Sequence, residues 1–453
     1  MSIGRQEDSP PADAPRVSLR TALRESPGVV RLAIVRFAGQ FGDGMFQAAL
    51  SGAILFNPER ETDPLAVAAG FAVLLLPYSV IGPYAGALLD RWDRRAVLLV
   101  ANVLRAVLIA VASVCLVAGI AEPPLLLLAL AVIGISRFVM AGVSAALPKV
   151  LAQQWLVPMN SVLATVASGC AATGAAIAVA VIGVIGAGDF ASAVAVAISA
   201  TGSVLGALLA AGFRPGVLGP EEGSEVREGT VHAIVTGLRT GASAVWQSVS
   251  VTTAMIGIGT HRVVFGANTL IMVLVLRHVP GGSGLSSGLI GFGVAIAAAA
   301  AGMLVAAVVA PLVIPRLGRS RTVVTGLVAA MIVQLTLVTP IAVAEAGAAA
   351  ERAHNLLLAG AFLFGLAGQT IKLTGDATMQ IDIDDAWRGQ VFALQDTVFN
   401  IAFVSAIALA AVLIPDDGRS LPVVVAGAVG YGLGILAIAL NSRRRAARVG
   451  TDQ

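Results

Sequence analysis

Charged residues are scarce in this sequence. Only 12% of its 453 residues are Asp, Glu, Lys or Arg, and 57% are hydrophobic. A soluble globular protein carries about 25% charged residues, and the mean hydropathy here is +0.89. This composition excludes a string of ordinary soluble domains, although the length alone would suggest about three of them. The sequence therefore predicts an integral membrane protein.

Residues that bind metals or build catalytic centres are also few. The two cysteines, Cys115 and Cys170, lie in apolar segments without metal-ligand spacing, so we expect buried, inert thiols and no disulfide framework. The four histidines are scattered, and no His-Glu-x-x-His motif supports a metalloprotease. No Gly-x-x-x-x-Gly-Lys-Ser/Thr loop is present to bind ATP phosphates, which disfavours an ATP-driven pump. We expect no enzymatic activity, no cofactor and no metal.

Long apolar runs make up most of the chain. A helix needs about 20 apolar residues to cross roughly 30 Å of hydrocarbon, and only helices and closed barrels satisfy their backbone groups in lipid. The runs are continuous and lack the two-residue alternation of barrel strands. They predict an all-α membrane protein with twelve transmembrane helices, over residues 30–56, 66–89, 96–120, 124–147, 159–186, 189–213, 249–277, 285–314, 322–343, 355–379, 389–414 and 420–441.

The longest polar interruption, from Arg214 to Thr230, divides the predicted helices into two groups of six. Just after it, the segment from Val231 to Ser248 has apolar residues at helical spacing, and we expect it to lie on the membrane surface. The predicted domains are a disordered cytoplasmic tail (1–29), a first six-helix bundle (30–213), a linker with an amphipathic helix (214–248), a second six-helix bundle (249–441) and a basic tail (442–453).

Basic residues predict the orientation in the membrane. Of the 29 Lys and Arg residues, five lie deep within the predicted spans, and four lie in one set of loops or at the span ends beside them, namely Arg60, Arg277, Arg352 and Arg419. The remaining twenty lie near the termini and in the other loops. Because cytoplasmic loops are enriched in Lys and Arg, both termini are expected inside, in a multi-pass protein of the cytoplasmic membrane. The basic residues form no footprint with aromatic residues that would indicate a nucleic-acid partner.

A charged turn, GALLDRWDRR at residues 86–95, separates the second and third predicted helices. Together with the six-plus-six arrangement, it resembles the major facilitator superfamily, whose signature there is Gly-x-x-x-Asp-Arg-x-Gly-Arg-Arg/Lys. Asp93 stands where the family usually has Gly, and we expect the turn to survive because Asp tolerates left-handed backbone. The matching residues are Gly86, Asp90, Arg91, Arg94 and Arg95.

A second stretch, DDAWRGQVFALQD at 384–396, is similar to the start of helix 11 in drug/proton antiporters and macrolide-efflux-like exporters. The resemblance implies that Asp90 faces the amino end of helix 11, where free amides and the helix dipole favour an anion. The alternative is that the arginines of this loop only set the topology. The predicted cytoplasmic gate consists of Gly86, Asp90, Arg91, Arg95 and Arg388.

Charges within the spans are costly and are therefore functional candidates. Arg36 and Asp43 are seven residues apart on the first predicted helix and share a face, with Gln40 beside them. Asp43 is our candidate for a titratable coupling acid. The alternative is a permanent ion pair between Asp43 and an Arg of a neighbouring helix. Arg36 lines the cavity or extends to the membrane surface.

Further candidates lie on other predicted helices. The resemblance implies that helix 4 lines the cavity, so Arg137 is expected to bind an anionic group or to pair with Asp43. Arg105, on the more peripheral helix 3, is expected to be a structural link to the signature loop. His261 either relays protons near neutral pH or is merely hydrogen-bonded. Arg262 is a permanent cation that needs a partner.

The remaining charged and polar candidates lie on predicted helices 10 and 11. Lys372 and Asp376 are four residues apart on one helix and are expected to pair. Gln369 lies deeper and is neutral, and Asp396, roughly two turns into helix 11, is expected at the inner gate. The candidates for coupling or the substrate cavity are thus Asp43, Arg36, Gln40, Arg137, His261, Arg262, Gln369 and Asp396.

These features predict a secondary transporter in which one half rocks against the other. The family branch implies proton-coupled export of a small amphipathic or drug-like compound. The expected cavity is apolar, with few aromatic residues, which suits a lipophilic substrate better than a sugar. The expected partners are this substrate, protons and the lipid bilayer, and the protein is expected to be a monomer. Alternatives are a lipid, lysophospholipid or siderophore transporter of the same fold, or a non-transporting membrane sensor.

Overall fold

The computed structural model describes residues 27–55, 64–73, 92–152, 156–219, 230–277, 288–343 and 348–451. Within these ranges the chain is helical and contains no strand. The helices are α2 (Pro27–Leu55), a short apolar helix (Pro64–Val73), α4 (Arg94–Val117), α5 (Glu122–Val150), α6 (Leu156–Ile185), α7 (Asp189–Ala211), α8 (Thr230–Gln247), α9 (Val249–Arg277), α10 (Gly288–Leu317), α11 (Arg319–Val333), η2 (Gln334–Val338), α12 (Thr339–Val343), α13 (Ala348–Asp382), α14 (Asp385–Leu413) and α15 (Leu421–Thr451).

Ten helical segments of the described chain are long and apolar enough to cross a membrane, with α11, η2 and α12 forming one of them. The multi-pass membrane character that the composition predicts is thereby confirmed. Helix α2 is 29 residues long but is not among the ten. It carries Arg36, Gln40, Asp43 and Gln47, the polar residues of the predicted first span.

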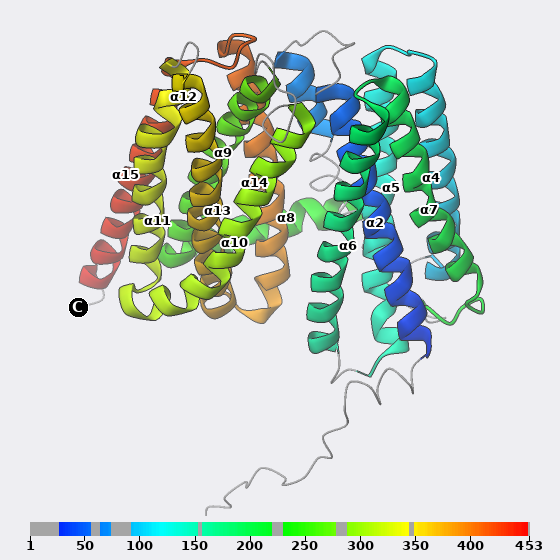
Figure 1. Ribbon diagram of the computed structural model, residues 1–453. Helices are drawn as coiled ribbons and strands as arrows, with labels where there is room; N and C mark the ends of the chain where they lie inside the picture. The colour runs from blue at the N-terminus through cyan, green and yellow to red at the C-terminus, as the bar shows by residue number, and fades with distance from the viewer. Residues whose placement is uncertain are drawn as a thin grey trace, which may run out of the picture.

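The helices gather in two groups, which Figure 1 shows side by side. In one group, α2 packs on α6 and α7, and α4 packs on α5 and α7. In the other, α10 packs on α13, and α9 contacts α13, α14 and α15. Contacts between the groups include those of α10 with α2 and α6. Helix α8, in the predicted amphipathic segment, lies crosswise to the bundle helices (Figure 1) and contacts α14 and α9.

Small residues let the helices approach closely, as is common in membranes. Gly202 of α7 lies against the Ala38 carbonyl of α2, and Gly365 of α13 lies against the Ala299 carbonyl of α10. At both positions, a Cβ atom would collide with the neighbouring backbone. Close packing of this kind brings polar side chains on facing helices within reach of one another.

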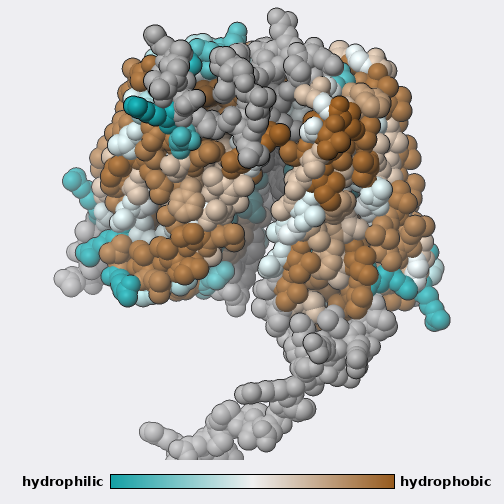
Figure 2. All heavy atoms as spheres, in the orientation of Figure 1, coloured by the Kyte–Doolittle hydropathy of each residue, from teal (hydrophilic) through white to brown (hydrophobic). Residues whose placement is uncertain are grey.

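A crevice separates the two groups of helices. In Figure 2 it is open at the end where α2 begins. Farther along α2, the two groups meet at a cavity that Gln47 lines together with residues of α10. There the ring of Phe71, on the short helix, meets the ring of Phe403 of α14 edge-on, with centroids 6.4 Å apart. Apolar side chains cover much of the outer surface in this view (Figure 2), as a lipid-embedded protein requires.

One predicted span is not a uniform α-helix. The prediction for 322–343 was a single helix, but the structure contains a five-residue π-helix, η2, between α11 and α12. Pro340 is the second residue after η2 and has no backbone N–H to donate to the preceding turn. The hydroxyl of Thr339 donates to the Gln334 carbonyl, at 3.4 Å. Such π-turns occur frequently at functional sites.

Candidate functional site

A buried ion pair joins α2 to α4. Asp43 Oδ1 lies 2.7 Å from Arg105 Nη2, and the two side chains are 6% and 1% exposed. Gln40 Nε2 donates to the other carboxylate oxygen of Asp43, at 3.1 Å. The structure thus brings together Gln40 and Asp43, two of the predicted site residues.

The partner of Asp43 corrects a prediction. Arg105 was expected to link the helix to the signature loop, whereas it pairs with Asp43. The reason is that α2 and α4 both pack on α7, so the long Arg105 side chain reaches across to α2. Arg137, which was expected to bind an anionic group or to pair with Asp43, is half-buried on α5, and Arg36 is half-buried on α2.

The predicted cytoplasmic gate is only partly described. Gly86, Asp90 and Arg91 lie outside the described residues, and so does the side chain of Arg388. Arg95 contacts its own half: Nε donates to the Phe213 carbonyl at 2.8 Å, and Nη2 donates to the Ala211 carbonyl at 3.2 Å. These are carbonyls at the C-terminal end of α7, where free acceptors and the helix dipole favour a cation.

Asp93 caps a helix. Its Oδ1 accepts a hydrogen bond from the Arg95 backbone N–H, at 3.0 Å, and it is the N-cap residue of α4 with φ −57° and ψ 110°. The expectation of left-handed backbone at this position was therefore wrong. Asp is a preferred N-cap residue because its carboxylate satisfies amides that the first helical turn leaves free.

His261 of α9 is buried in an aromatic environment. Its Nδ1 is 3.1 Å from the hydroxyl of Tyr431 on α15, and its ring stacks on Phe265 with centroids 5.8 Å apart. The imidazole fills the space over Gly368 of α13, where a Cβ atom would collide with it. This setting agrees with a hydrogen-bonded His261 that ties α9, α13 and α15 together.

Charged side chains of α9, α13 and α14 form a cluster, which we call the charge cluster and which consists of Arg262, Lys372, Asp376 and Asp396. Lys372 Nζ lies 2.6 Å from Asp376 Oδ2, so the predicted pair is confirmed. Electrostatic interactions connect Asp396 with the other three members. Arg262 and Lys372 line a small cavity of about 40 Å³ together with Gln369. The structure therefore brings four predicted candidates to one place, His261 included.

Two polar residues of this half were not identified as site candidates from the sequence. Gln395 Nε2 donates to Asp376 Oδ1 at 3.1 Å. Gln334 is fully buried at the start of η2 and exchanges two hydrogen bonds with Asn268 of α9, at 2.6 and 3.2 Å. The sequence feature that could have identified Gln334 is its position as a single amide within the apolar run AAMIVQLTLV.

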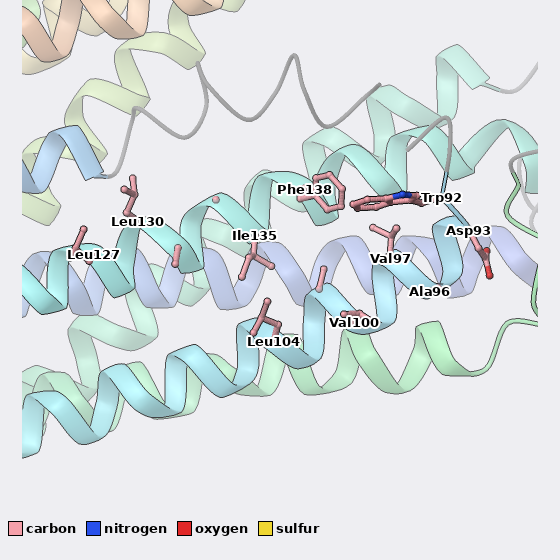
Figure 3. Close-up of a pocket in the computed structure, with 13 residues that line it drawn as sticks. Trp92, Asp93, Ala96, Val97, Val100, Leu104, Leu127, Leu130, Ile135 and Phe138 are labelled. Carbon is pink, nitrogen blue, oxygen red and sulfur yellow. The ribbon is translucent and has the colours of Figure 1, made fainter. Parts of the chain in front are cut away.

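Two apolar hollows differ in position. A cavity of about 230 Å³ lies between the helix groups, lined by Gln47 and Phe71 on one side and by residues such as Phe265, Asn268 and Phe403 on the other. A larger groove of about 970 Å³ runs along α4 and α5 (Figure 3). Asp93 and Trp92 lie at one end of that groove, and the other lining residues are apolar. The groove belongs to one helix group only, so it does not lie between the two halves.

Comparisons with known proteins agree with this architecture. A sequence model of the Major Facilitator Superfamily matches residues 32–407. Uncharacterized MFS-type transporters of Mycobacterium tuberculosis (strain ATCC 25618 / H37Rv) and Mycobacterium bovis (strain ATCC BAA-935 / AF2122/97) are each 40% identical over 431 residues, which is 94% of this chain and 94% of each relative.

Solved structures show the same fold. The crystal structure of the nucleoside transporter NupG has a TM-score of 0.66 at 14% identity, over 91% of this chain and 98% of that chain. A POT family transporter in complex with 5-aminolevulinic acid has a TM-score of 0.63 at 15% identity, over 92% of this chain and 95% of that chain. At such low identities the likeness concerns the fold alone.

Proposed function

The chain belongs to the Major Facilitator Superfamily, and from this membership we propose that it exports a small amphipathic compound by proton-coupled alternating access. The observation that carries the proposal is the crevice between the two helix groups. It is open at one end (Figure 2) and closed at the other by Phe71 against Phe403. A path that is open to one side only is the starting state of a transporter whose halves rock about a central site.

The proposed topology has twelve spans, namely the ten apolar helices together with α2 and a second span that begins at the short helix. The proposed orientation places both termini in the cytoplasm, because the basic residues concentrate on that side. The crevice then opens to the cytoplasm, from which an exporter takes its substrate. We further propose that the protein is a monomer of the cytoplasmic membrane and not an enzyme.

For proton coupling, the charge cluster supports a different acid from the one that the sequence favoured. Asp43 is held by Arg105, and protonating it would leave the buried Arg105 cation without its partner, at a cost of about 3–5 kcal/mol. Asp396 is exposed and has charged neighbours of both signs. We assign the coupling proton to Asp396 and a structural role to Asp43.

The charge cluster also bears on the alternative substrates. Lysophospholipids and siderophores with anionic groups need a site with excess positive charge. The cluster instead pairs two bases, Arg262 and Lys372, with two acids, Asp376 and Asp396, and Lys372 already contacts Asp376. This balance favours a substrate without a strong negative charge.

Purified protein in liposomes tests the function. Three aromatic probes of different charge are offered under an imposed pH gradient: neutral N-phenylnaphthylamine, its sulfonated anion anilinonaphthalenesulfonate, and the cation tetraphenylphosphonium. We expect gradient-dependent movement of at least one probe, with counter-movement of protons. If none of the three moves faster than in protein-free liposomes, the proposed function is wrong.

The same assay separates the two acids. Asp396→Asn should abolish substrate-induced proton movement while the protein remains folded, whereas Asp43→Asn should lower the melting temperature and leave coupling intact in the folded fraction. The reverse result, with coupling lost only in folded Asp43→Asn protein, would return the coupling role to Asp43.

A further inference from the structure

The 230 Å³ cavity between the two helix groups lies beside the contact that closes the crevice. We propose that it binds an uncharged aromatic ligand, through ring contacts and through one amide from each half. The inference rests on the proposed function, because it takes the crevice as the transport path, and it adds the chemical class of the compound.

Aromatic rings from both halves line this cavity. Phe265 of α9 and Phe403 of α14 have ring centroids 6.1 Å apart, and Phe403 continues to Phe71 at 6.4 Å. Phe364 of α13 adds a further ring to the lining. Aromatic rings prefer edge-on or offset contacts at such distances. A planar ligand ring entering the cavity would meet three elements of the second half and the short helix of the first.

The polar groups of the lining are neutral. Gln47 projects from α2 in the first half and Asn268 from α9 in the second, with Thr269 beside Asn268. Among the described residues, no Asp, Glu, Lys or Arg lines the cavity. An ion here would lose its hydration without a counter-charge, which is costly. A neutral ligand with one donor or acceptor is satisfied, because an amide offers both.

Gln334 acts as a positioning residue for Asn268. It is fully buried, its amide exchanges two hydrogen bonds with Asn268, and its Nε2 also donates to the Val424 carbonyl at 3.2 Å. These contacts fix the orientation of the Asn268 amide before any ligand arrives. The remaining N–H and the second lone pair of Asn268 are then available to a ligand at little further cost in ordering.

The position of the cavity relates binding to transport. Its walls come from both halves, so the ligand site is complete only when Gln47 and Phe71 face α9 and α14. A ligand shifts a conformational equilibrium by the difference in its affinity for the two states. The cavity volume of about 230 Å³ is below the roughly 300–1,000 Å³ of drug-sized sites. This volume suits a ligand of one or two ring systems.

The test is equilibrium binding to purified protein in nanodiscs. N-phenylnaphthylamine is neutral, and anilinonaphthalenesulfonate is the same skeleton with a sulfonate, so the pair isolates the effect of charge. Empty nanodiscs give the lipid background for each probe. We expect saturable binding of the neutral probe and at least about tenfold weaker binding of the sulfonate, a difference of roughly 1.4 kcal/mol.

Variants locate the binding site. Phe403→Leu keeps apolar volume but removes a ring, and Gln47→Ala removes one amide; each should weaken binding of the neutral probe several-fold. Gln334→Leu should do the same without touching the ligand, and the conservative Gln334→Asn should restore part of the affinity. Phe190→Ala and Gln247→Ala, at exposed positions, are the matched controls and should bind normally.

Equal binding of both probes, or neutral-probe binding that Phe403→Leu and Gln47→Ala leave unchanged in folded protein, would overturn the inference. Ligand binding can be measured without transport, so the proposed ligand class and the proposed transport function can be refuted independently of each other. Transport of a charged probe without cavity binding of the neutral one refutes the ligand class alone. Cavity binding without transport of any probe refutes the function.

Discussion

Asp43 on α2 and Arg105 on α4 form a buried ion pair in the first half, with 2.7 Å between Oδ1 and Nη2. Gln40 supports the carboxylate from the same helix as Asp43, at 3.1 Å. Two helices that both pack on α7 are thereby held in one register relative to each other. The pair has the geometry of a permanent structural contact, which is why the proposed coupling acid lies elsewhere.

Removing one member of this pair should destabilise the protein strongly. Arg105→Met or Asp43→Leu alone leaves an uncompensated buried charge, which costs about 3–5 kcal/mol, whereas the double substitution replaces the pair by apolar contacts at a much smaller cost. Melting temperatures of the purified proteins in detergent measure the effect. We expect both single variants to melt well below the double variant.

The half-exposed pair of Arg319 with Asp382 (2.8 Å) is the control. Pairs that are open to solvent contribute about 0–1 kcal/mol, so Asp382→Asn should change the melting temperature little. Additive losses in the Asp43 and Arg105 double variant would contradict the structural role of the pair.

Gln334 should matter for stability as well as for the cavity. Gln334→Leu removes both hydrogen bonds to the Asn268 amide and the additional one to the Val424 carbonyl. An unsatisfied buried polar group costs about 1–3 kcal/mol. We expect a lower melting temperature for Gln334→Leu and no change for Gln247→Leu on the exposed surface of α8. A Gln334→Leu protein as stable as the parent would show that the amide pair contributes nothing.

Gly368 has no side chain and so leaves room for the imidazole of His261. A Cβ atom at this position would collide with the imidazole, so Gly368→Ala should force His261 and Tyr431 apart. Overpacking of this kind typically costs 1–3 kcal/mol. Gly432→Ala on α15 is the matched control, because nothing lies within 4 Å of its would-be Cβ and Ala has the higher helix propensity. Circular dichroism melts of both variants measure the difference, and a Gly368→Ala protein that melts like the control contradicts the close packing.

Replacing Asp93 by Gly, the residue that the family usually has at this position, should be tolerated. As an N-cap, its replacement by Gly costs only a few tenths of a kcal/mol, whereas replacement by Ala costs about 0.5–2 kcal/mol. We therefore expect Asp93→Gly to remain close to the parent in melting temperature and Asp93→Ala to fall below both. An Asp93→Gly protein that melts well above the parent would indicate that the turn needs left-handed backbone at this position, and an Asp93→Ala protein as stable as the parent would contradict the capping role.

The sequence predicted the second half of the site better than the first. Lys372 and Asp376 pair as predicted, because residues four apart on one helix are neighbours whatever surrounds them. His261, Arg262 and Gln369 meet around one cavity, since helices 7 and 10 of the predicted set pack together. In the first half, an ion pair of Asp43 with an Arg of a neighbouring helix was the alternative that the structure contains, but Arg137 was named as the possible partner in place of Arg105. Helical spacing identifies the face of a residue and not the helix opposite that face.

Sequence alone determined that this is a helical membrane protein of the Major Facilitator Superfamily. The length of the apolar runs and the scarcity of charge are sufficient for membrane insertion, and the charged turn at 86–95 carries the family signature. Tertiary structure alone decided that Arg105 reaches Asp43, that Arg95 caps α7, that Gln334 holds Asn268 and that Phe71 meets Phe403. Each of these contacts depends on the rotation and spacing of packed helices, which the pattern of residues along a single helix does not fix.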